Sequence, residues 1–321
     1  MALLRTDFTT QLTSKGYEIF WETYDYTPDV WQELFEEKDT NDAYVEDSSM
    51  MGMGDLVEKE ENEPITYDAP MDGYPCVGKV RTFSRGMAWS YESYKDTEVE
   101  GLFETCISSW SESYKRTRDR FYAQFFNYGA YTAGHDVFNN TIAGVKTDPT
   151  GNLIYDGVAF FSTAHPDKVG NTYSNYSAAL TLTYDNLRTV YETMTSTNAF
   201  DDKGDEIEIE PDTILVPPSQ YITALSIVNS DRLPHDATTP SKPNPFYNKF
   251  EIIKWRRLTD TDCWILLQRK KGLVALNRED VSIDVWVDPE TKQYKASILA
   301  RFGGYVRNWR WTYACNLPTS G

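Results

Sequence analysis

A serine and a histidine three residues apart, Ser162 and His165, come closest in this sequence to part of a catalytic site. The chain has only three histidines, so chemistry that depends on histidine has few candidate residues. A serine nucleophile must lie within hydrogen-bonding reach of its base, and at this spacing the side chains would meet on a helix. Pro166 and the turn-forming residues around it argue against a helix, and no G-x-S-x-G turn surrounds Ser162. We therefore expect a loop in which backbone contacts fix His165, with a soluble hydrolase using Ser162 and His165 as the enzymatic alternative.

The acidic stretch 201–210 (DDKGDEIEIE) has the composition of a calcium-binding loop. An EF-hand loop takes acidic or amide side chains at its first, third and fifth positions, and Lys203 occupies the third. A turn at Lys203 and Gly204 that leads into an alternating strand from Ile207 explains the stretch better. The sequence has no phosphate-binding glycine motif and no cysteine–histidine spacing typical of a metal site. We therefore predict no catalytic residue, no cofactor and no metal ion.

The chain carries a net charge of −18 over 321 residues, which argues against an open nucleic-acid-binding surface and against binding to anionic lipid. The charge is uneven, because residues 1–74 hold 19 acidic and 4 basic residues, whereas residues 242–310 hold 14 basic and 8 acidic ones. We expect these two parts to contact each other, within one copy or between copies. The candidate basic residues are Arg256, Arg257, Lys270 and Lys271.

The four cysteines form no CxxC pair, which favours buried thiols in a reducing compartment over disulfides. The N-terminal residues lack the long apolar core of a signal peptide. No stretch approaches the roughly 18 apolar residues that a membrane span needs. These features predict folding in the cytoplasm and no membrane partner.

Residues 1–55 are acidic and rich in aromatic side chains, but they have too little apolar periodicity to fold by themselves. The one helix that we expect there begins at Thr27 as N-cap, with Pro28 at its first position. Residues 64–92 alternate and carry turn residues at 72–75, which predicts a long β-hairpin. A two-stranded hairpin is marginal in water, so both segments should depend on another surface.

The clearest element is a helix over residues 96–131, with apolar side chains spaced three or four residues apart. Thr97 and Glu100 form a capping box at its start. Its basic cluster is expected to be a solvated, paired face and comprises Lys115, Arg116, Arg118 and Arg120. Further helices are predicted over 183–197 and 219–229. Strands are predicted over 213–216, 249–257 and 263–269, with a strand meander over 273–313, so the class is α+β.

Three blocks of the sequence resemble the major capsid (head) proteins of tailed bacteriophages. The first is residues 160–187, with FFSTAHP, GNTYSN and LTLTYDNL in that order. The second is residues 204–218 (GDEIEIEPDTILVPP) followed by a helix, and the third is residues 300–310 (ARFGGYVRNWR). The order of arm, hairpin, long helix, mixed region and final strands matches as well, so the resemblance spans nearly the whole chain.

The resemblance implies the Hong Kong 97-type phage capsid fold, with an N-terminal arm, an extended β-hairpin loop, a long spine helix, and peripheral and axial domains. Residues 1–55 would be the arm and 56–93 the extended loop. Residues 94–131 would form the spine helix of the peripheral domain. Residues 132–280 would form mainly the axial domain, and 281–321 would be strands that return to the peripheral domain.

The implied function is that of a structural protein that self-assembles into the icosahedral head shell around the phage genome. The expected partners are copies of the chain in hexamers and pentamers, a separate scaffolding protein, a portal and a decoration protein. The shell would enclose double-stranded DNA without sequence-specific binding and would be assembled in the bacterial host cytoplasm. An encapsulin-like nanocompartment shell is the alternative with the same fold. The expected subunit-interface residues are Trp21, Trp31, Asp72, Tyr74, Phe83, Trp89, Arg256 and Arg257.

Overall fold

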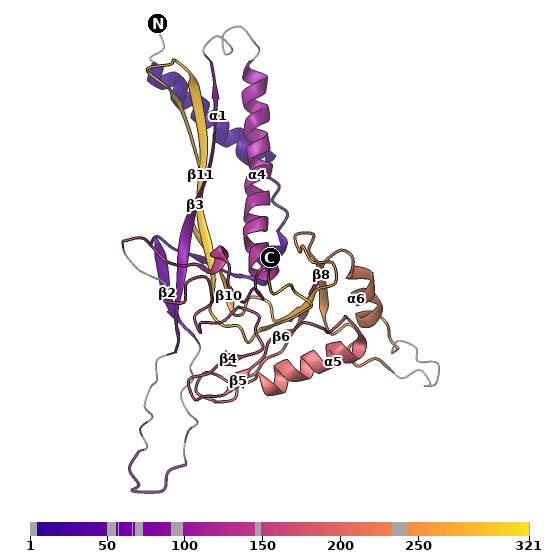
Figure 1. Ribbon diagram of the computed structural model, residues 1–321. Helices are drawn as coiled ribbons and strands as arrows, with labels where there is room; N and C mark the ends of the chain where they lie inside the picture. The colour runs from indigo at the N-terminus through magenta and orange to yellow at the C-terminus, as the bar shows by residue number, and fades with distance from the viewer. Residues whose placement is uncertain are drawn as a thin grey trace.

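Two five-stranded sheets and a 29-residue helix organise the chain in the computed structural model. The structure describes residues 5–49, 56, 58–65, 67, 73–90, 99–144, 149–232 and 243–320. Figure 1 shows the long helix running beside the long strands of one sheet, while the shorter elements gather around its lower end.

The helices are α1 (Arg5–Thr23), α2 (Val30–Leu34), α4 (Val99–Asn127), α5 (Tyr184–Glu192) and α6 (Tyr221–Val228), with a 3₁₀ turn η1 (Asp136–Phe138) and a π turn η2 (Thr193–Thr197). The strands of the first sheet are β1 (Glu36–Asp39), β2 (Tyr44–Ser48), β3 (Pro75–Trp89), β10 (Leu273–Val287) and β11 (Tyr294–Val306). Those of the second sheet are β6 (Tyr176–Ser177), β7 (Thr213–Val216), β8 (Glu251–Lys254), β9 (Trp264–Leu267) and β12 (Thr312–Cys315). A small pair joins β4 (His165–Pro166) to β5 (Thr172–Tyr173).

The first sheet has the order β1-β10-β11-β3-β2, and β11 lies antiparallel to both of its neighbours. Buried and half-buried residues alternate along β11 from Tyr294 to Phe302, so one face of the sheet carries the core. Helix α4 covers this face (Figure 1). Its buried apolar stripe consists of Phe103, Ile107, Trp110, Tyr114, Phe121 and Phe125. The three- and four-residue spacing of this stripe is what makes the helix fit the sheet.

The second sheet has the order β6-β12-β9-β7-β8, and one of its faces forms a second core with α5 and α6, while Leu215, Ile253 and Ile265 on its strands join the core beside α4. Every residue of β7, β9 and β12 is buried, which is expected for strands covered on both faces. Helix α5 begins where the Thr183 hydroxyl accepts the N–H of Asn186, and it buries Leu187 and Val190.

Several predicted elements are confirmed within the described residues. The predicted long helix corresponds to α4, although its predicted cap at Thr97 lies outside the described residues. The helices predicted over 183–197 and 219–229 correspond to α5 with η2 and to α6. The strands predicted at 213, 249 and 263 correspond to β7, β8 and β9. The turn at Gly204 is present with φ +94°, but residues 207–210 do not form the expected strand.

The predicted hairpin over 64–92 is wrong in its pairing. Residues 75–89 form one strand, β3, which pairs with β11 along most of its length and with β2 at its start. Described residues 58–65 contain no strand. The antiparallel partner of β3 at the base of the loop is thus residues 44–48, which the alternation pattern alone did not identify.

The N-terminal arm differs from the prediction because it packs on its own chain. Residues 5–23 form α1, which was not predicted and which contacts both α4 and β10. Helix α2 begins after Asp29, two residues later than expected, and the Gln32 side chain accepts the Asp29 N–H. The chain therefore supplies the surface that the arm was expected to find elsewhere.

Two further expectations are corrected. The strand meander begins at Leu273 as predicted, but β12 lies in the second sheet and not with β10 and β11 in the first. Arg118 does not belong to a solvated face, since its side chain is 11% exposed and lies over the ring of Trp31 at 4.7 Å. A cation stacked on aromatic rings is stabilised by their quadrupoles, which offsets part of its lost hydration.

Candidate assembly surfaces

The arm residue Trp31 lies in the core of its own subunit. It is 1% exposed, and its ring stacks on that of Tyr122 with centroids 4.3 Å apart. Arg118 covers the ring, as described above. A side chain enclosed in this way has no surface left for a second copy, so the predicted subunit contact of Trp31 is replaced by an internal one. Trp21 is half-buried at the edge of the same core, and its predicted interface role stays a prediction.

The acidic arm finds basic partners at α4 and just after β11. The ammonium of Lys115 lies 2.8 Å from a carboxylate oxygen of Asp25 and 3.6 Å from one of Asp29. The hydrogen bond from Lys115 lowers the pKa of Asp25 far below its usual range, whereas burial raises the pKa of Asp29. Arg307 pairs with Glu36 at 2.5 Å. The expected contact between residues 1–74 and the basic part 242–310 therefore occurs within one copy at Arg307, whereas Lys115 belongs to α4 and lies outside that basic part.

The four basic residues predicted from charge are placed differently. Arg257 donates from Nε to Asp119 on α4 at 2.7 Å, so its partner is the long helix and not the arm. Lys270 meets the arm only through its backbone N–H, which donates to the last carbonyl of α2. The side chains of Arg256, Lys270 and Lys271 are exposed. A contact of Arg256 or Arg257 with a neighbouring subunit stays a prediction.

The loop between β2 and β3 presents apolar side chains to solvent. The exposed fractions are 101% for Leu56, 65% for Ile65 and 88% for Tyr67. Residues 58–63 between them carry four glutamates and one lysine and are also exposed. The predicted interface residue Asp72 lies outside the described residues. Exposed apolar groups gathered on one projecting segment are typical of a surface that another chain covers.

An apolar groove lies between α4 and the β3–β11 side of the sheet. Phe83 and Phe302 stack along its floor at 4.2 Å, and Trp110 and Tyr114 of α4 line its other wall. The groove has a volume of about 200 Å³, and the exposed Arg85 lies at its rim. Phe83 thus packs on Phe302 within its own subunit and also lines the groove. A contact between Phe83 and a neighbouring subunit is compatible with this position and stays a prediction.

The other two predicted aromatic residues lie at opposite ends of β3. Trp89 stacks on Tyr294 at 6.2 Å and packs on Phe103, so it helps to join the end of β3 to the sheet and the helix. Tyr74 is half-buried at the base of the loop, where its ring contacts the ammonium of Lys168 at 5.0 Å. Their contact with a neighbouring subunit stays a prediction.

The pair Ser162 and His165 does not form a serine–histidine site. The ring of His165 lies between Asp156, 2.6 Å from Nδ1, and the side-chain oxygen of Asn175, 3.0 Å from Nε2. The side chains of His165 and Asp156 are 0% and 1% exposed, so a substrate has no access to them. The Ser162 hydroxyl accepts the N–H of Ala164, and no described hydrogen bond joins it to the ring. Side-chain contacts to Asp156 and Asn175 therefore hold this histidine in addition to the backbone pairing of His165 with Tyr173.

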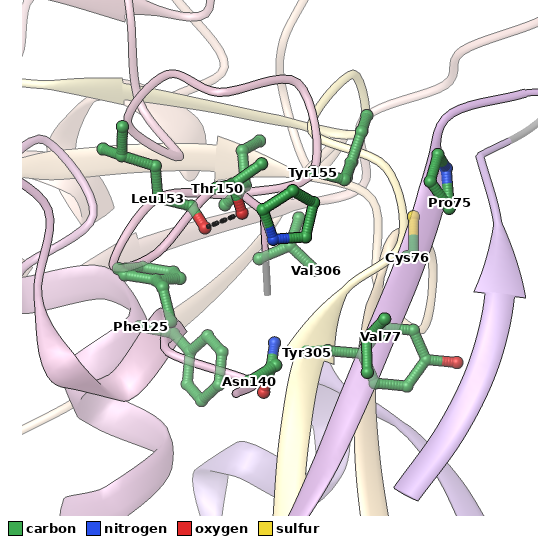
Figure 2. A pocket seen from close by; sticks show the side chains of 13 residues that line it. Pro75, Cys76, Val77, Phe125, Asn140, Thr150, Leu153, Tyr155, Tyr305 and Val306 are labelled. Atoms are coloured by element: carbon green, nitrogen blue, oxygen red, sulfur yellow. Dashed lines mark hydrogen bonds between the residues drawn. The ribbon is translucent and has the colours of Figure 1, made fainter. Parts of the chain in front are cut away.

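A cavity of about 130 Å³ separates the start of β3 from the loop after η1. Figure 2 shows Pro75 and Cys76 on one side of it, with Leu153 and Phe125 on the other. Burial raises the pKa of the Cys76 thiol above its usual range, so this cysteine stays protonated and is a poor nucleophile. The cavity is mainly apolar, and its lining offers no acid–base pair for catalysis within the described residues.

The acidic stretch after residue 200 serves local structure. The Asp201 carboxylate accepts the backbone N–H groups of Lys203 and Asp205, which closes the turn. Asp202 pairs with Arg310 at 2.9 Å. The described residues contain no group of three or more side chains placed to hold a metal ion. None of the helices in the described part of the chain combines the length and apolarity that a membrane span requires.

One group of contacts at the base of the loop was not predicted from the sequence. Ser49, at the end of β2, bonds to Tyr74 and to Asp202, which lies 153 residues further along the chain. Such a contact has no local pattern, since it depends on how the two sheets sit against each other. The only sequence signals were the small residues Ser49 and Gly73 at the two ends of a polar segment.

A family model and two solved structures relate this chain to phage capsid proteins. A sequence profile described as phage capsid protein matches residues 77–315. The capsid of bacteriophage JBD30 has a similar structure, with a TM-score of 0.53, 14% identity, and coverage of 73% of this chain and 92% of that one. The capsid of cyanophage P-SCSP1u has a TM-score of 0.52 and 10% identity, and the match covers 91% of this chain and 89% of that one. No curated protein matches the sequence.

Proposed function

The chain belongs to the phage capsid protein family, and we propose how this major capsid protein joins its copies in the head shell. It is a structural protein of the virion with the α+β Hong Kong 97-type fold expected from the resemblance. We propose that the loop between β2 and β3 of one subunit docks in the groove between α4 and β3 of its neighbour. The observation that carries this proposal is the exposure of Ile65 and Tyr67 on a loop that has no partner surface of its own among the described residues.

Charge supports the same pairing of loop and groove. The loop carries glutamates around its exposed apolar residues, including Glu63, and Arg85 stands at the rim of the groove. An acidic loop and a basic rim attract each other and disfavour the wrong register. The apolar residues would supply most of the stabilisation, at about 25 cal/mol per Å² of apolar surface buried.

Repetition of this loop–groove contact from one subunit to the next would build the larger assembly. Copies would associate in hexamers and pentamers, because a head-to-tail contact between loop and groove closes into rings when its rotation permits. We propose that a separate scaffolding protein, a portal and a decoration protein complete the head. Assembly would take place in the bacterial host cytoplasm, around or before the entry of double-stranded DNA that is held without sequence-specific contacts.

The test is a double variant, Ile65→Ser with Tyr67→Ser, in the full chain. We expect a folded subunit with normal melting behaviour that no longer forms shells under conditions where the parent protein does, as seen by negative-stain microscopy. The matched control is Tyr67→Phe, which keeps the ring and should assemble normally. Normal shells from the double variant would show that the loop does not carry assembly.

A further inference from the structure

The two ends of the loop are tied together at its base. The N–H of Ser49 donates to the carbonyl of Tyr74 at 2.8 Å, and the N–H of Tyr74 donates back to the Ser49 hydroxyl oxygen at 2.8 Å. A side chain at Gly73 would place its Cβ 2.5 Å from the Ser49 carbonyl oxygen, so only glycine allows the ends to approach this closely. Two crossed hydrogen bonds and one close approach therefore set the spacing at which the chain enters and leaves the loop.

The same serine is fastened to the region beside the second sheet. Its hydroxyl donates a short hydrogen bond to the Asp202 carboxylate, whose other oxygen lies 2.9 Å from a guanidinium nitrogen of Arg310. The side chains of Arg310 and Asp202 are 0% and 1% exposed. The described residues give the guanidinium nitrogens no hydrogen bond, and among them this carboxylate is the anion within ion-pair distance of the buried cation. The pair therefore has a fixed position, because separating it would leave an unpaired charge away from water.

A second contact points the same way. The Lys168 ammonium donates to the carbonyl of Gly73 at 3.0 Å and lies 5.0 Å from the ring centre of Tyr74. Lys168 follows β4, and its N–H donates to the carbonyl of Asp202 at 3.3 Å. In Figure 1 the base of the loop accordingly lies next to β4 and β5. Residues outside the first sheet thus hold both ends of the loop: Asp202 holds Ser49, and Lys168 holds Gly73.

We propose that Ser49 is a positioning residue for assembly. Its hydroxyl fastens the base of the loop to the Asp202–Arg310 pair and fixes the direction in which the loop leaves the subunit. The loop belongs to the first sheet through β2 and β3, whereas Asp202 and Arg310 lie outside that sheet, so the contact orients the loop against a second part of the subunit. The angle between neighbouring subunits, and with it the curvature of the shell, is then set partly by this contact. The inference rests on the proposed docking of the loop on a neighbour.

The test compares Ser49→Ala with Ser48→Ala in the full chain. Ser48 is the exposed neighbour on β2 and serves as the matched control. A hydrogen bond to a charged group corresponds to about a tenfold change in an equilibrium constant. We expect Ser49→Ala to raise the concentration at which half of the subunits assemble by about tenfold and to widen the spread of particle diameters. Ser48→Ala should match the parent protein in both measurements.

Hydrogen exchange on unassembled subunits separates positioning from folding. The Tyr74 amide should lose protection in Ser49→Ala, while amides of β11 keep theirs. Loss of protection in β11 as well would overturn the proposal, because Ser49 would then act through the fold as a whole. Assembly at the parent concentration with parent diameters would also overturn it. If Ser49→Ala assembles normally while the Ile65→Ser and Tyr67→Ser double variant does not, only the positioning role fails; if both assemble normally, the proposed docking fails as well.

Discussion

The N-terminal segment and the loop between β2 and β3 are both acidic and both carry large apolar residues, but among the described residues the arm buries its aromatic rings in its own subunit, whereas Ile65 and Tyr67 of the loop do not. Phe20, Trp31 and Phe35 are buried in the core beside α4. Ile65 and Tyr67 are exposed. The difference lies in what the same chain offers to each segment. Helix α4 presents an aromatic stripe and two cations along the path of the arm, and the described residues present no such surface along the loop.

The comparison separates what makes the subunit from what joins subunits. Burial of apolar area is the main stabilising contribution to folding and to association. The arm gains it when the subunit folds, and under the proposed docking the loop gains it only on assembly. Variants in the arm should therefore change the free energy of unfolding of the unassembled subunit. Variants in the loop should leave that free energy nearly unchanged and alter shell formation.

The largest effect is expected from Trp31→Ala. This change removes a fully buried ring that stacks on Tyr122 and is the nearest ring to the Arg118 guanidinium, so the free energy of unfolding should fall by about 3–5 kcal/mol. Urea unfolding of the unassembled subunit, followed by circular dichroism, measures it. Trp21→Ala is the matched control and should cost about 1 kcal/mol, since that ring is only half-buried. If the Trp31→Ala subunit were as stable as the parent protein but failed to assemble, Trp31 would act at a contact between subunits and not in the core.

A smaller effect is expected at the contact between the arm and Lys115. The folded-state pKa of Asp25 is depressed, so its ion pair contributes stability above its unfolded pKa of about 3.9 and loses it progressively as the pH falls below that value. Asp25→Asn should remove this part of the acid sensitivity of α1, measured as amide exchange of the helix between pH 5 and pH 3.

Asp29 provides the control of opposite sign for that experiment. Burial raises its pKa, so its charged form destabilises the folded arm at neutral pH and protonation relieves this as the pH falls. Asp29→Asn keeps a good helix N-cap and should leave α1 as protected as in the parent protein, or more so, at pH 7. Identical pH profiles for the two variants would contradict the assignment of Asp25 as the stabilising partner of Lys115.

The sequence predicted those elements whose pattern is local. Helix α4 repeats apolar residues every three or four positions over many turns, and β7 is a short apolar run stopped by prolines. Helix α1 escaped prediction because its 19 residues include five threonines and a glycine, which have low helix propensity, and because its stability comes from contacts with α4 and β10.

Pairing and assembly were harder to predict than the elements themselves. The partner of β3 is β11, more than 200 residues later, and alternation in β3 fits a hairpin partner equally well. Among the predicted interface residues, Trp31 and Tyr74 were expected to be in contact with other residues because they are aromatic. Residue type alone cannot show whether that contact is within the chain or with another copy. The contact between Ser49 and Asp202 joins residues far apart in the sequence and arises only from the tertiary structure.

Cryo-electron microscopy of shells assembled from the full chain would show whether the arm packs within its own subunit and the loop on a neighbour. We predict that residues 5–35 lie along α4 of the same chain, with Trp31 against Tyr122. We also predict that Ile65 and Tyr67 enter the groove between α4 and β3 of the adjacent subunit. A shell in which the arm crosses to the neighbouring α4, or in which the loop lies on its own subunit, would contradict this account.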